Sequence, residues 1–485
     1  MKFISNISKA GLVIMMLFTA FAITSCKDDL PGEMDTSLQF TELKSIKILN
    51  TGANGDVVLE GTIDENTKKI SFPRIDTLTN FENLKFEAVL SDGAKLEQDA
   101  FNIAFEEGKS EKQIVLKVVN APRYREYLTT LRLKVPVYGA DFTKGVIFDF
   151  SNNALGNPLY PDYVGASTRG AAFDGEYVMV PSRFGSVNPH LLKVSDLKAG
   201  IINKVNLNTT NVTGGTLAVQ TGAFVNGNLY VFNVSSAVGF KMYYYENYKE
   251  NYNKPPLVIT VPVGDLPIAT TYNTRFGENT SVNLDENGNG YIYMPNNPVQ
   301  HILRLKISNY TQVVERSVLP LPVSGMTFGM SYNQIGNSSQ YLCTSYGVPM
   351  YIMTDGGSIV SPIATSVFEA SAAGARIIYF NNERYLMYMT AGINSSSVTV
   401  FKVYNITRGK TIEEAIGYFA AQSDLDKKPV FEFALNGGSN AAPITYTSWK
   451  IEKDNNGKDS KLLLFTAGTD AGFSIFEFPV NVATD

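Results

Sequence analysis

A pattern of roughly 50 residues recurs through the second part of the chain, and a repeat of this kind limits the folds open to the chain. Each copy contains a strand of small residues, a tight turn, a strand rich in aromatic and β-branched residues, a polar loop and a third alternating strand. A fourth strand follows several copies, for example at Ile202–Leu207 and Leu257–Val263. Copies begin near Arg169, Thr221, Arg275, Thr327, Ala375 and Ile444.

Four strands within this period are typical of one blade of a β-propeller. The copies therefore predict an all-β, six-bladed propeller over residues 145–485, or a seven-bladed one if residues 150–163 hold part of another blade. The apolar stretch Gly145–Phe150 is expected to pair with the last blade, because such pairing closes the ring and protects sheet edges. Thr411–Ala421 begins with Thr-x-x-Glu and predicts one short capped helix.

The N-terminus indicates export and lipidation. Lys2 and Lys9 precede an apolar run that ends at Ile23, too short to span a bilayer comfortably, and Ser25-Cys26 follows. This order predicts a lipoprotein signal peptide over residues 1–25, with Cys26 as the lipidated first residue of the mature protein. Polar residues 26–37 are expected to form a tether, so the lipid alone would attach the protein to the membrane.

Residues 38–138 carry short alternating runs, such as Lys44–Leu49, Leu84–Leu90 and Tyr127–Val135, separated by Asn-Gly and Asp-Gly turns. This spacing predicts an antiparallel β-sandwich of about seven strands. The only cysteine besides Cys26 is Cys343, which lies in an apolar strand and is predicted to be a small core residue.

The run Lys27-Asp28-Asp29 directly after Cys26 resembles the surface-export signal of Bacteroidetes lipoproteins. The segment 38–138 resembles the immunoglobulin-like N-terminal domains of outer-membrane lipoproteins from the same phylum, which hold the next module away from the membrane. The whole layout resembles a group of Bacteroidetes propeller lipoproteins of unassigned function. The resemblance implies a lipid-anchored protein exposed on the surface of the outer membrane.

That resemblance also implies a non-catalytic role in polysaccharide capture, with an oligosaccharide or an outer-membrane glycan-uptake protein as partner. Two alternatives remain open. A propeller glycoside hydrolase or lyase would need two acidic residues converging at the channel, and a cell-surface scaffold would dock other proteins through a flat apolar face. The sialidase-type repeat S-x-D-x-G-x-T-W is absent from the sequence, which disfavours the enzyme.

Propeller geometry indicates where a ligand could bind. The loop entering each innermost strand and the loop between the second and third strands open on the same face. Arg169, Arg275 and Arg376 stand at the predicted starts of inner strands, which would bring three guanidinium groups to one rim. They could bind a carboxylate or a sugar, although each could instead hold neighbouring blades together through backbone carbonyls. Trp449, the only tryptophan, is expected on the inner strand of the last blade, where a core position is favoured over a ligand contact, although the side chain would face the channel if the strand phase is right. The candidate ligand-binding residues are Arg169, Arg183, Asn188, Arg275, Asn296, Arg376 and Trp449.

Two further motifs have a structural and a functional interpretation. The run Lys241–Tyr252 holds five tyrosines that could form a glycan platform, but a strand with alternating tyrosines is the favoured interpretation. Asp285–Gly290 matches the first half of a calcium loop, yet Asn296 stands where a bidentate Glu is required, which favours a hairpin turn.

Other function classes find little support. The net charge of −5, with 41 basic and 46 acidic residues well mixed, gives no basic stripe and disfavours nucleic acid as a partner. With two histidines, a zinc site cannot be assembled, and a histidine-based triad would have to use one of them. The sequence indicates no cofactor and no metal site.

Overall fold

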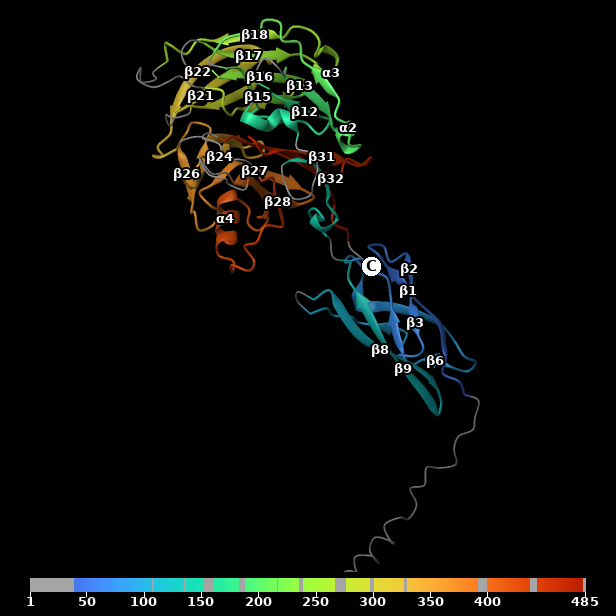
Figure 1. Ribbon diagram of the computed structural model, residues 1–485. Coiled ribbons are helices and arrows are strands. Elements are labelled where there is room, and N and C mark those ends of the chain that lie inside the picture. Colours follow the sequence, from blue (N-terminus) through green and yellow to red (C-terminus); the bar gives the residue numbers. More distant parts are fainter. Residues whose placement is uncertain are drawn as a thin grey trace, which may run out of the picture. The chain divides into compact units, whose positions relative to one another are not determined.

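The computed structural model describes residues 39–106, 109–134, 137–151, 160–166, 168–182, 188–215, 217–234, 239–266, 276–296, 301–326, 329–390, 399–436 and 443–482. The predicted signal peptide, Cys26 and the predicted tether lie outside these ranges, and so do Arg183 and Arg275. The described residues form two compact units, one up to Lys134 and the other within Val137–Val482. Figure 1 shows the first unit in blue to teal and the second from teal through green and yellow to red.

The first unit consists of two sheets around one core. One sheet has the order β2 (Val57–Glu60), β1 (Leu43–Thr51), β5 (Leu84–Leu90), β7 (Ala100–Phe101), and the other has the order β3 (Thr62–Asp64), β4 (Lys69–Ser71), β9 (Arg123–Arg132), β8 (Glu111–Asn120), β6 (Lys95–Leu96). Alternate residues of these strands, such as Ile46, Phe86, Leu116 and Tyr127, point into a shared core.

The pairing of β4 with β9 is parallel, so the prediction of a purely antiparallel sandwich was wrong at this point. Alternation along each strand reveals which residues face the core, but both strand directions give the same alternation. A short 3₁₀ segment, η1 (Phe81–Asn83), leads into β5 and is capped by the side chain of Asn80.

The second unit contains six four-stranded antiparallel sheets within the described residues. The first three are β11 (Ala172–Phe173), β12 (Tyr177–Val180), β13 (His190–Lys193), β14 (Lys204–Asn206); β15 (Leu217–Val225), β16 (Asn228–Val234), β17 (Phe240–Tyr245), β18 (Leu257–Val261); and β19 (Ser281–Leu284), β20 (Gly290–Pro295), β21 (His301–Ser308), β22 (Gln312–Pro320).

The next two sheets are β23 (Ser331–Gln334), β24 (Gln340–Thr344), β25 (Met350–Thr354), β26 (Ile359–Ile363); and β27 (Ala372–Phe380), β28 (Glu383–Thr390), β29 (Val400–Asn405), β30 (Phe431–Ala434). The last has the order β10 (Val146–Ser151), β33 (Gly472–Pro479), β32 (Asp459–Gly468), β31 (Thr445–Lys453). These sheets correspond to the sequence repeats, and Cys343 on β24 is buried as predicted.

Hydrophobic cores join these sheets in a closed ring. One core lies between each sheet and the next along the chain, and a sixth joins the last sheet back to the first. In this sixth core the rings of Phe173 and Phe465 stack with their centroids 5.0 Å apart. The first strands β11, β15, β19, β23, β27 and β31 also contact one another in the same cyclic order.

The predicted closing strand is confirmed. β10 pairs antiparallel with β33, so an N-terminal strand completes the sheet formed by the end of the chain. A buried carboxylate reinforces the pairing, since Asp149 Oδ1 accepts hydrogen bonds from Ser474 Oγ and Ser151 Oγ, both at 2.6 Å.

The predicted helix is also confirmed as α4 (Ile412–Ala420), which begins with a capping box between Thr411 and Glu414. Its apolar face, with Ile416 and Phe419, packs on the core between the fourth and fifth sheets. The other short helical segments are α2 (Val194–Lys198), α3 (Tyr248–Asn251), η2 (Phe142–Lys144) and η3 (Pro161–Ala166). Within the described ranges, we find no helix with the length and apolar character needed to cross a membrane.

Candidate functional site

A cavity of about 650 Å³ lies where the first strands of the sheets converge. Residues on or beside β11, β15, β19, β27 and β31 line it, which places five of the six sheets around one space. A volume of this size lies in the range of small-molecule sites. Its wall combines aromatic rings with charged and hydroxyl groups, chiefly Phe173, Asp174, Thr280, Arg376, Tyr446 and Trp449.

Arg376 lies in the middle of β27 and is partly buried. Its guanidinium carbon is 5.7 Å from the ring centroid of Tyr446 and 5.9 Å from that of Trp449, both on β31. Burial lowers the pKa of Arg376, and the same burial raises the pKa of the Tyr446 hydroxyl. Arg376 nevertheless stays protonated at neutral pH, because the ordinary pKa of a guanidinium is far above 7. The cavity wall therefore holds a cation against two aromatic rings.

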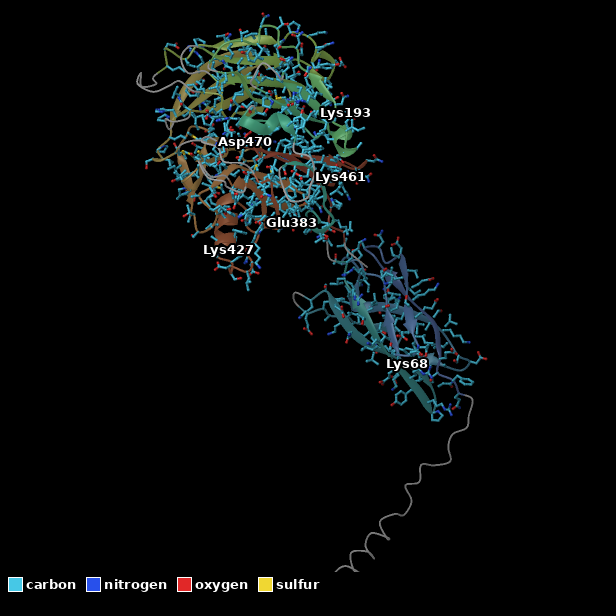
Figure 2. All side chains as sticks on the ribbon, in the orientation of Figure 1. Lys68, Lys193, Glu383, Lys427, Lys461 and Asp470 are labelled. Carbon is cyan, nitrogen blue, oxygen red and sulfur yellow. The ribbon has the colours of Figure 1, made fainter. Side chains whose placement is uncertain are left out.

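The carboxylates in the cavity wall are already engaged. Asp174 Oδ2 accepts a hydrogen bond of 2.6 Å from Tyr248, and its Oδ1 accepts two from backbone N–H groups. Glu176 pairs with Lys249. Glu452 lies 3.4 Å from Lys461, which Figure 2 labels on β32. Each carboxylate thus has a partner within the protein.

Two of the predicted ligand-binding residues, Arg376 and Trp449, come together in this cavity. The sequence placed Arg376 at the start of its strand, and this was wrong: β27 begins at Ala372, so Arg376 lies four residues further along. Its strand carries a register shift between Ala373 and Arg376, which redirects the side chains that follow. Trp449 lines the cavity and also packs against the core between the fifth and sixth sheets.

The other described candidates do not line the cavity. Arg169 precedes β11 and is partly buried. Asn296 is fully buried, and its backbone N–H donates to His301. Asn188 accepts a hydrogen bond from His190 through its backbone carbonyl. The expected convergence of three arginines on one rim is therefore not what surrounds this cavity, while Arg183 and Arg275 lie outside the described residues.

The sequence missed the contribution of the turns after the first strands. Asp174–Glu176 and Asn226 line the cavity, yet their Asp-Gly and Asn-Gly pattern indicates only a hairpin. The tyrosine run is structural, as favoured: Tyr243 and Tyr245 donate to backbone carbonyls from buried positions on β17. Asp285 Oδ1 caps its turn by accepting from the N–H groups of Asn287 and Asn289, which confirms the hairpin interpretation.

A buried polar cluster lies in the first sheet. The Nδ1–H of His190 donates to the Asn188 carbonyl at 2.8 Å, which leaves Nε2 to accept from the Tyr160 hydroxyl at 2.5 Å. Asp162 lies 3.5 Å from Nε2 and is paired with Lys204 at 2.7 Å. Burial lowers the pKa of His190, with the nearby Asp162 acting in the opposite direction. The imidazole is therefore neutral in the folded protein at neutral pH.

This cluster predicts a loss of stability in mild acid. Because the pKa of His190 is lower in the folded than in the unfolded chain, its stabilising contribution is complete above about pH 6.5 and falls as the pH drops below that value. The free energy of unfolding should change by up to about 1.4 kcal/mol per pH unit in this window. Urea unfolding at pH 7.5 and 5.5 should show a smaller difference for His190→Gln than for the native chain. Equal differences would contradict this role of His190.

Among the residues that the structure describes, no cluster of three or more His, Cys, Asp or Glu side chains is placed to hold a metal ion.

The comparisons with known proteins are more informative. The model of the DUF4623 family, described as a domain of unknown function, matches residues 28–481. The chain belongs to the DUF4623 family. This confirms the expectation of a family whose function is unassigned.

A crystal structure of a DUF4623 protein from Bacteroides eggerthii is similar over nearly the full length. The two sequences are 40% identical, the match covers 91% of this chain and 99% of that one, and the TM-score is 0.80. A Bacteroides thetaiotaomicron protein of unknown function is 13% identical, over 92% and 93% of the two chains, with a TM-score of 0.39. The WD40 β-propeller domain of Doa1 is 7% identical, over 75% and 86%, with a TM-score of 0.32. No curated protein matches this DUF4623 chain.

Proposed function

We propose that this DUF4623 protein is a lipid-anchored protein of the outer-membrane surface, in which an immunoglobulin-like sandwich carries a six-bladed propeller that binds an oligosaccharide without cleaving it. The six cores in cyclic order support the propeller assignment, because a ring of sheets closed by its own first strand has the construction of that fold. The lipid anchor at Cys26 and the surface location rest on the N-terminal sequence pattern.

The single observation that carries the binding role is the pairing of Arg376 with Tyr446 and Trp449 in the wall of the central cavity. Aromatic faces stack on the C–H surfaces of sugar rings, and a guanidinium donates paired hydrogen bonds to sugar or carboxylate oxygens. A non-catalytic role is supported by the carboxylates of the wall, since Asp174, Glu176 and Glu452 each have a protein partner. Glycoside hydrolysis requires two carboxyl groups that are available to the substrate.

The test uses the chain from Thr36 onward, which keeps every described residue, against arrays of host and plant glycans. We expect retention of one class of oligosaccharide with no released product, and a loss of affinity of about tenfold or more in Trp449→Ala. Tyr418→Ala is the matched control, because it removes an exposed ring on α4 that lies outside the cavity wall. Released product would favour a glycosidase or lyase, and no retention on any glycan would favour a protein partner.

Trp449 also offers a direct signal. It is the only tryptophan of the chain, so all tryptophan emission comes from the cavity wall. A bound glycan should change the intensity or wavelength of this emission in proportion to occupancy. Binding without any change would place the ligand elsewhere on the protein.

A further inference from the structure

Arg376 is a cation without an anion. Among the described residues, no hydrogen bond or ion pair joins its guanidinium to another group, and its Nε atom is buried without a partner. Its neighbours are the faces of Tyr446 and Trp449. A buried N–H group that lacks an acceptor, as at this Nε, has lost water without replacement, and this is costly to the folded protein. The position therefore suits an anion that arrives with a ligand.

The charges around the cavity point the same way. Glu176 and Lys249 neutralise each other, and the carboxylate of Glu452 is paired with Lys461. Asp174 is held by Tyr248 and two backbone N–H groups. Among the described residues of the wall, the cations left without an ion pair are Arg376 and the exposed Lys450.

A hydroxyl group adds a second unsatisfied position. Thr280 Oγ1, beside β19, lines the same cavity and is buried without a hydrogen-bond partner in the described structure. Arg376 lies on the fifth sheet and Thr280 directly precedes the third, so two different sheets each place a residue with an unpartnered polar atom in the wall of one cavity. Sites that orient a small ligand typically have a few such groups in a largely preformed wall.

We propose that the cavity recognises an acidic sugar, with the ring carboxylate of a uronic acid bound by Arg376 and the sugar face lying against Trp449. This inference rests on the proposed glycan-binding function and adds the charge of the ligand. A carboxylate matches the planar fork of a guanidinium, which can donate two parallel hydrogen bonds to its two oxygens. The guanidinium carbon lies over the rings of Tyr446 and Trp449, and Arg376 itself lines the cavity.

The experiment compares each acid with its own methyl ester, because esterification removes the charge and keeps the sugar ring. Oligogalacturonides and hyaluronan fragments, in acid and methyl-ester forms, are titrated against the chain from Thr36 while Trp449 emission is followed. One of the two acids is expected to bind at least tenfold more tightly than its ester, and added NaCl is expected to weaken binding of the acid more than that of the ester.

Arg376→Gln should remove the preference for the acid and leave the weaker affinity for the ester. Arg408→Gln, which makes the same change of charge at an exposed position outside the wall, should keep the preference. Arg376→Lys keeps the positive charge but lacks the paired donors of a guanidinium, so it should keep only part of the preference for the acid. It provides a second variant if the Gln variant does not fold.

Equal affinity for acid and ester, or a preference that survives in Arg376→Gln, would overturn the acidic-sugar proposal while glycan binding itself stood. A sulfated glycan that binds in place of any uronic acid would overturn the choice of carboxylate. Failure of every acidic and neutral glycan to bind would overturn the proposed function as well, so the two failures are distinguishable.

Discussion

A chain that begins at residue 152 is expected to lose the cooperative unfolding transition that a chain beginning at Val137 retains. The shorter chain lacks β10, which pairs with β33 over its whole length. Without β10, the edge of β33 and the core around Phe473 would be open to water and to other molecules. The carboxylate of Asp149 would no longer accept from Ser474, whose buried hydroxyl would lose its partner.

The residues directly before β10 add to this effect. The backbone N–H of Ala140 donates to the buried Tyr385 hydroxyl at 2.9 Å, and Phe142 packs on Phe478 with ring centroids 4.7 Å apart. Deleting residues 137–151 therefore weakens both the last sheet and its attachment to the preceding one. Thermal unfolding followed by circular dichroism, together with size-exclusion chromatography, would compare the two chains. A monomeric shorter chain with an unchanged melting temperature would show that β10 is dispensable.

The substitution Phe476→Ala is expected to lower the free energy of unfolding by about 3–5 kcal/mol. Phe476 on β33 is fully buried, and its ring lies 5.4 Å from Phe401, 5.0 Å from Phe431 and 5.1 Å from Phe433 between centroids. Alanine would leave a cavity between the fifth and sixth sheets, because strands held by hydrogen bonds on both sides cannot move in to fill it.

Urea unfolding followed by far-UV circular dichroism measures this change. Val146→Ala on β10 is the control, because that side chain is 50% exposed and its truncation should change the free energy by no more than about 0.5 kcal/mol. A loss of less than about 1 kcal/mol for Phe476→Ala would mean that the core between these sheets tolerates a void.

The regular part of the fold could be predicted because each repeat buries alternate aromatic and branched residues. Each core, such as the one around Phe232 and Met294, requires apolar residues at the same positions of every sheet. These positions are visible in the sequence as the repeat. The closing strand and α4 were also predictable from local sequence. An apolar strand outside the repeats is expected to pair with an existing sheet, and a capping box marks the first turn of a helix.

The site was harder to predict because it depends on side-chain direction. In β27 the partner of Ala373 is Met389 and the partner of Arg376 is Met387, so one extra residue is accommodated between them. Gly374 lies there with a φ of 63°, in the left-handed region that favours glycine. A shift of one residue moves a side chain to the other face of a strand, so alternation alone could not place Arg376 beside Trp449.

The first and last strands of the second unit are neighbours in one sheet. β10 and β33 are hydrogen-bonded neighbours, and Ala140 forms a bridge with Val480 beyond them. A domain whose N- and C-terminal ends lie close together can be inserted into a surface loop of another protein, because the two ends of that loop are also close together. The same closure allows new ends to be opened in a connection between any two sheets, with the old ends joined by a short linker. The second unit is therefore suited to domain insertion and to circular permutation.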